Sequence, residues 1–191
     1  MKKADKRPLI AVVGDGSLEA GDERLALAEE LGTRLVEHQY RVLTGGLGGV
    51  MEAACRGAHR AACYRDGDTV GLLPGTDIQT RNAYVDIAIP TALGHVRNAL
   101  CAQSVAVIAV GGGAGTLSEL ALAWVHNRLI IALKTTGWSG RLADQRIDER
   151  LRFPTIPDDR VYAAADPAQA IETLNRWLPF YGSGQRDDEG R

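Results

Sequence analysis

Short apolar runs alternate with longer stretches of helical periodicity along most of the chain. This alternation is typical of βαβ units that feed one parallel sheet. The apolar runs are rich in Val, Ile and Leu and predict strands at residues 9–13, 40–43, 69–73, 85–89, 105–110, 129–133 and 161–162. The stretches between them predict helices at residues 23–37, 50–62, 94–103, 117–126, 145–150 and 166–178. We therefore predict a doubly wound, Rossmann-like α/β fold, a parallel sheet with helices on both faces.

The whole pattern fits a single domain over residues 8–181. With 191 residues and 45% hydrophobic content, the chain is within single-domain size and can bury a substantial core. Residues 1–7 are predicted to be a flexible N-terminus. Residues 182–191 contain no apolar side chain, which predicts a disordered tail. Residues 134–160 are polar and poorly periodic, so little structure is predicted there.

Charge and cysteine content narrow the range of partners. Lys and Arg number 22 against 24 Asp and Glu, a net charge of -2, which offers no basic surface for a nucleic acid polymer. The three cysteines form no C-x-x-C pair and the four histidines are scattered, so we expect reduced thiols and no metal site. No apolar run is long enough for a signal-peptide core or a membrane span. We expect a cytoplasmic protein without a membrane partner.

Three of the predicted strands end in glycine turns that open a helix, at residues 14–17, 45–49 and 111–116. Glycine lets the backbone pass close to a bound group, and the following helix directs free N–H groups toward it. The carboxyl ends of parallel strands meet at one edge of the sheet, so the turns converge on one crevice. Tight turning alone explains any single turn, but three together favour a phosphate-bearing ligand. The candidate phosphate-binding residues are Gly14, Ser17, Gly45, Gly46, Gly48, Gly112, Gly113, Gly115 and Thr116.

Two common nucleotide motifs are missing from these turns. No G-x-G-x-x-G with an acidic residue about 20 positions later follows the first strand, and there is no G-x-x-x-x-G-K-[ST] loop. Thr116 and Glu119 have the spacing of a capping box, which is one explanation for the glutamate. The other explanation is that Glu119 faces the ligand. Ser17 likewise either binds phosphate or caps its turn.

The motif at residues 111–119, Gly-Gly-Gly-Ala-Gly-Thr-Leu-Ser-Glu, resembles the P-G-G-x-G-T-x-x-E motif of the Lonely Guy family. Residues 45–51 are similar to the second glycine loop of that family, and the resemblance extends over residues 9–178. It implies a phosphoribohydrolase that cleaves the N-glycosidic bond of a nucleoside 5′-monophosphate to free base and ribose 5-phosphate. It also implies catalytic roles for Arg97 and Glu119, no required cofactor, and a homodimer or higher homo-oligomer.

Two positions depart from the phosphoribohydrolase pattern. Gly111 stands where the motif has proline, and Asn98 stands where these enzymes usually have lysine. With glycine at 111 and asparagine at 98, the sequence more closely resembles a bacterial branch of the superfamily that includes molybdenum-cofactor carrier proteins. The alternative is therefore a non-catalytic carrier or sensor of molybdenum cofactor or another phosphorylated ligand. In the phosphoribohydrolase chemistry Arg97 would clamp the phosphate or ribose with its planar, always-charged guanidinium, unless it forms only a surface ion pair.

Overall fold

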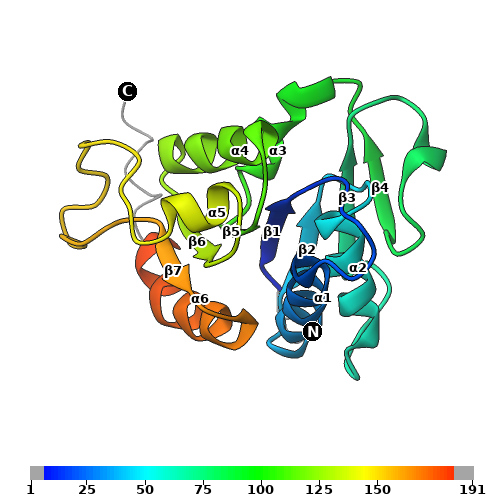
Figure 1. The fold of residues 1–191 in the computed structure, drawn as a ribbon, viewed down its shortest axis with the longest axis horizontal. Coiled ribbons are helices and arrows are strands. Elements are labelled where there is room, and N and C mark those ends of the chain that lie inside the picture. The colour runs from blue at the N-terminus through cyan, green and yellow to red at the C-terminus, as the bar shows by residue number, and fades with distance from the viewer. Residues whose placement is uncertain (1–6, 183–191) are drawn as a thin grey trace, which may run out of the picture.

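A computed structural model describes residues 7–182 of the chain (Figure 1). Its seven strands form one sheet in the order β4-β3-β2-β1-β5-β6-β7, and every neighbouring pair is parallel. The predicted doubly wound α/β fold is therefore confirmed. The strands are β1 (Leu9–Gly14), β2 (Arg41–Thr44), β3 (Thr69–Leu73), β4 (Ile87–Pro90), β5 (Ala106–Val110), β6 (Leu129–Leu133) and β7 (Tyr162–Ala164).

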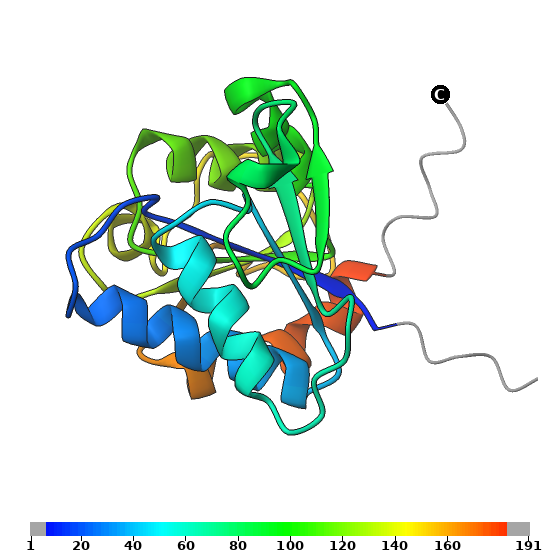
Figure 2. The same ribbon diagram turned by 90° about the vertical axis from the view of Figure 1, so that its right-hand side faces the viewer.

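Helices cover both faces of this sheet. Ile10 and Val12 of β1 pack into the core beneath α1, α2 and α6, and Ala11 and Val13 pack into the core beneath α3 and α4. Figure 2 shows α1 and α2 side by side on the first of these faces. The helices are α1 (Glu23–Glu37), α2 (Val50–Arg60), α3 (Asn98–Cys101), α4 (Ala114–Val125), α5 (Trp138–Leu142) and α6 (Pro167–Gly182), with 3-10 turns η1 (Ile78–Thr80) and η2 (Gly94–Arg97).

Two glycines let α1 and α2 pack with their backbones close together. A side chain at Gly32 would overlap the carbonyl of Ala54, and one at Gly57 would overlap the carbonyl of Glu29. The contact fixes α2 on the sheet. Because α2 begins at Val50, directly after the second glycine turn, the same contact also fixes that turn.

The sheet reverses its winding direction at β1, which pairs with β2 on one side and with β5 on the other. In open α/β sheets the crevice at such a point, beyond the carboxyl ends of the strands, is where ligands bind. The turns after β1 and β5 therefore face each other across the point where a site is expected.

Three predicted helices need correction. No helix forms at residues 145–150. The side chain of Arg146 donates to the carbonyls of Arg150 and Asp159. The carboxylate of Asp148 accepts a hydrogen bond from the indole of Trp124. The short helix of this region is α5 instead. The helix predicted at 94–103 is the 3-10 turn η2 followed by one turn of α3. The helix predicted to begin at 117 begins three residues earlier.

The segments predicted to be flexible, 1–7 and 182–191, lie outside the described residues except for Arg7 and Gly182. Arg7 forms an ion pair with the buried carboxylate of Asp68, and Gly182 ends α6. Among residues 7–182 no helix is long and apolar enough to cross a membrane. The cysteines are free thiols, as predicted.

Candidate functional site

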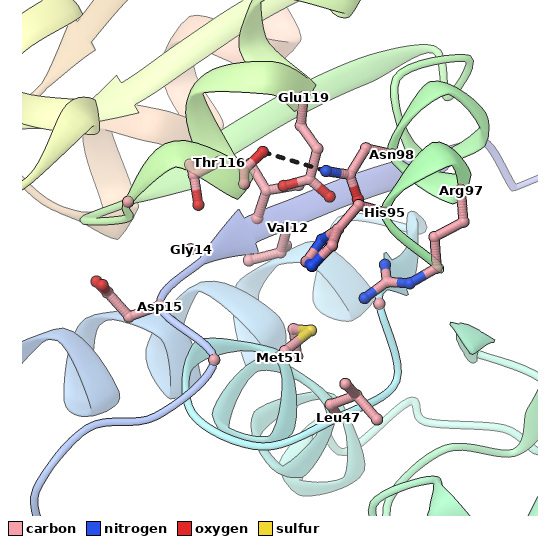
Figure 3. A pocket seen from close by; sticks show the side chains of 15 residues that line it. Val12, Gly14, Asp15, Leu47, Met51, His95, Arg97, Asn98, Thr116 and Glu119 are labelled. Carbon is pink, nitrogen blue, oxygen red and sulfur yellow. Dashed lines mark hydrogen bonds between the residues drawn. The ribbon is translucent and has the colours of Figure 1, made fainter. Parts of the chain in front are cut away.

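A cleft of about 360 Å³ opens where β1 and β5 end (Figure 3). Its walls come from the first two glycine turns, from η2 and from the first turns of α4. The volume lies within the range of small-molecule sites. The lining residues are Val12, Val13, Gly14, Asp15, Gly16, Gly45, Leu47, Met51, His95, Arg97, Asn98, Gly113, Gly115, Thr116 and Glu119.

The amino end of α4 is open toward this cleft. Gly113 is the N-cap residue, and no side chain caps the helix. The first helical bond joins the N–H of Leu117 to the carbonyl of Gly113, so the amides of residues 114–116 precede it and have no helical acceptor. Nothing lies within 4 Å of a side chain built at Gly113 or Gly115. These amides and the helix dipole form a site suited to an anion.

The third glycine turn is held in a left-handed conformation. Gly111 has a φ of 67° and Gly112 a φ of 99°, and a side chain at Gly112 would overlap Thr116. The Gly111 N–H donates to Ser139 Oγ at 2.8 Å, and the Gly112 N–H donates to Asp15 Oδ2 at 2.7 Å. The bond from Gly112 joins the turn after β5 to the turn after β1.

Asp15 is in turn held by Arg24 near the start of α1. Arg24 Nη1 donates to Asp15 Oδ2 at 2.9 Å, and its other nitrogens bind Asp22. Hydrogen bonds from Arg24 hold the pKa of Asp22 at about 2. No sequence motif marks Asp15 or Arg24, because the bond from Gly112 to Asp15 exists only once the two turns meet.

Arg97 is buried at the opposite end of the cleft from Thr116, with its guanidinium pointing toward the middle of the pocket (Figure 3). A side chain at Gly45 would lie within 2.6 Å of both terminal nitrogens, so this glycine makes room for the guanidinium. Arg97 forms no ion pair with a described residue, and its Nε has no hydrogen-bond partner. The surface ion pair considered for this residue is therefore wrong. A buried donor without an acceptor is suited to an acceptor on a ligand.

Glu119 lies one turn into α4 and is also buried. Burial raises the pKa of its carboxyl to about 7, against the opposing effects of Arg97 and of a hydrogen bond with Cys101. Burial likewise raises the pKa of the Cys101 thiol to about 12. The capping box predicted for Thr116 and Glu119 is wrong, because the helix begins at Ala114 and both residues lie inside it.

A family model matches residues 7–171 of the chain. The chain belongs to the SLOG cluster4 family. The molybdenum cofactor binding protein from the phototrophic bacterium Rippkaea orientalis is 33% identical in sequence to this SLOG cluster4 protein. Its structure matches with a TM-score of 0.74, over 92% of the present chain and 99% of its own. The molybdenum cofactor carrier protein of Chlamydomonas reinhardtii is 34% identical, with a TM-score of 0.72 over 91% and 99%.

A protein of Archaeoglobus fulgidus described as uncharacterized is 38% identical over 126 residues, 65% of this SLOG cluster4 chain and 79% of its own length. Together the matches confirm the predicted relationship to the branch that contains molybdenum-cofactor carriers.

The two departures from the phosphoribohydrolase motif have structural reasons in this SLOG cluster4 protein. Proline cannot replace Gly111, because its ring fixes φ near −65° and removes the N–H that binds Ser139. Asn98 is buried, and its Nδ2 donates to Ser118 Oγ at 2.7 Å and to the Gly115 carbonyl at 3.3 Å. Asn98 therefore supports the first turn of α4.

The cleft brings together seven of the predicted site residues of the SLOG cluster4 chain. Four others lie outside its lining, and their ligand roles stay predictions: Ser17 is exposed, Gly46 binds Thr44 and Asn82, Gly48 packs near Gly16, and the Gly112 amide binds Asp15. Those in the cleft are Gly14, Gly45, Arg97, Gly113, Gly115, Thr116 and Glu119.

Proposed function

We propose that this SLOG cluster4 protein binds a phosphorylated small molecule, with the phosphate on the amides of residues 114–116. The observation that carries the proposal is the uncapped amino end of α4, which opens into the cleft between β1 and β5. Helix N-termini at such a position are well suited to phosphate. In this proposal the hydroxyl of Thr116, a residue of the cleft lining, adds a further donor.

We further propose that the ligand is a phosphate-bearing pterin of the molybdenum-cofactor type and that the protein acts as its carrier. Two relatives at 33–34% identity are described as a molybdenum cofactor binding protein and a molybdenum cofactor carrier protein. Arg97 lines the cleft at the opposite end from Thr116 and its Nε has no hydrogen-bond partner, so its guanidinium suits an acceptor on the ring system of such a ligand. Asn98 supports α4 and adds no positive charge for catalysis.

The carrier proposal is tested by purifying the protein from cells that make molybdenum cofactor. Mass spectrometry then identifies the small molecules released on denaturation. Gly113→Asp places a carboxylate in open space beside the first-turn amides, so it should lower the bound ligand at least about tenfold through charge repulsion. Gly113→Ala fits equally well, adds no charge and should retain the ligand. If Gly113→Asp retains as much ligand as Gly113→Ala, the proposed phosphate position is wrong.

A second candidate function is hydrolysis of a nucleoside 5′-monophosphate. The observation in its favour is Glu119, a buried carboxyl in the cleft whose pKa of about 7 lets it exchange protons near neutral pH. Such a carboxylate stabilises the positive charge that builds on ribose as an N-glycosidic bond breaks. Incubation with AMP should then release adenine from the wild type and not from Glu119→Gln. Ligand retention without release of base from any nucleoside monophosphate supports the carrier instead.

A further inference from the structure

The turn after β1 leaves one carboxylate oxygen of Asp15 without a hydrogen-bond partner among the described residues. Asp15 lines the cleft, and its Oδ2 accepts two hydrogen bonds, from the Gly112 amide at 2.7 Å and from Arg24 Nη1 at 2.9 Å. These bonds explain how Asp15 supports the glycine turn. Oδ1 accepts no hydrogen bond from any described residue, so the structural role leaves half of the carboxylate unused.

Asp15 also lies beside the proposed phosphate position. Its partner Gly112 directly precedes Gly113, the N-cap residue of α4. Figure 3 shows Asp15 and Thr116 at the same end of the pocket and Arg97 at the other. A phosphate on the amides of residues 114–116 therefore lies at the same end of the pocket as Asp15.

We propose that Asp15 Oδ1 accepts a hydrogen bond from a hydroxyl or amino group of the ligand close to its phosphate. The proposal rests on the phosphate site proposed above and adds a selection rule, because the site then prefers hydroxylated phosphomonoesters to simple alkyl phosphates. Arg24 offsets part of the negative charge of Asp15, which limits the repulsion between this carboxylate and the phosphate. The hydroxyl or amino group of the ligand offsets a further part of that charge.

Two small probes test this rule without knowledge of the natural ligand. Glycerol 3-phosphate and n-propyl phosphate share a phosphomonoester and a three-carbon chain, and only the first carries hydroxyl donors. Dissociation constants for both are measured from the NMR shifts of the amides at residues 113–116. The wild type should prefer glycerol 3-phosphate about tenfold, the scale of one hydrogen bond to a charged acceptor.

Asp15→Asn should reduce this preference to less than about twofold. The amide oxygen of the new side chain is needed by Gly112 and Arg24, so its NH₂ group takes the position of Oδ1 and cannot accept a hydrogen bond. Asp22→Asn is the matched control, because Asp22 also binds Arg24 but is not part of the cleft lining. It should keep the wild-type preference.

A wild type that binds both probes equally well overturns the inference and leaves the phosphate site intact. An undiminished preference in Asp15→Asn overturns it in the same way. If neither probe shifts the amides of residues 113–116 in the wild type, the phosphate site itself fails and the inference fails with it. If Asp15→Asn does not fold, equal binding of the two probes by the wild type still overturns the inference.

Discussion

Gly111 is the residue at which the sequence of this protein departs from the phosphoribohydrolase motif, and its backbone explains why. Its φ of 67° is accessible to glycine and closed to proline, and its N–H is used by Ser139. Glycine at this position therefore follows from the contact between the turn and Ser139 of α5. A proline at this position requires a differently shaped turn.

Gly111→Pro should consequently lower the free energy of unfolding by about 3 kcal/mol, from the forced change of φ and the loss of a buried hydrogen bond. Chemical denaturation with urea measures this difference. A variant as stable as the wild type would show that the turn adopts the proline conformation without cost, contrary to the structure.

Glu119 predicts a pH dependence of stability. Its pKa is raised from 4.5 to about 7 in the folded protein, so the folded state holds a proton that the unfolded state loses in this range. Glu119 therefore makes its full contribution to the free energy of unfolding below about pH 4.5. This contribution falls as the pH rises and is lowest above about pH 7. The change amounts to about 3 kcal/mol.

The measurement is the difference in unfolding free energy between the wild type and Glu119→Gln at several pH values. Glutamine has the same shape and does not titrate, so the other carboxyl groups cancel in the difference. A difference that stays constant from pH 4 to 8 would contradict a raised pKa at Glu119.

At the scale of single residues, the sequence predicts which residues form the site better than it predicts their hydrogen-bond partners. The spacing of glycines, Arg97 and Glu119 is visible in the chain, and the cleft brings these residues together. No pattern in the sequence points to Asp15, since its bond to Gly112 joins residues 97 positions apart. The unpaired Nε of Arg97 is likewise a property of the folded cleft alone.

At the scale of elements, the close contact of α1 and α2 positions the second glycine turn. Gly57→Ala should lower the free energy of unfolding by about 2 kcal/mol, because the added methyl group overlaps the Glu29 carbonyl and pushes the helices apart. Gly75→Ala is the control, since its nearest atom is 4.0 Å away. Equal thermal stability of the two variants would show that α1 and α2 adjust without cost.

The strongly periodic elements could be predicted from the sequence, and the polar segment after β6 could not. Residues 145–150 have enough helix-forming side chains to suggest a helix, but Arg146 and Asp148 bind distant partners instead. Arg152 forms a buried ion pair with Asp159 and stacks on Trp124. Tertiary contacts of this kind override local preference and leave no periodic signal.

At the scale of the whole molecule, we expect a homodimer or higher oligomer. Residues 87–100, from β4 through α3, include five large apolar side chains that are 43–70% exposed, and His95 and Arg97 of the cleft belong to the same segment. Val96→Asp should dissociate the oligomer, as measured by light scattering. Val125→Asp alters a comparably exposed valine at the end of α4 and should not. A monomeric wild type would contradict the expectation.

The position of the phosphate is tested most directly by a crystal structure of the protein with AMP bound. We predict that its phosphate accepts hydrogen bonds from the amides of residues 114–116, with the rest of the molecule extending toward Arg97. A phosphate bound elsewhere, for example among Lys134 and Arg141 beside α5, with the amino end of α4 left empty, would contradict the proposed site.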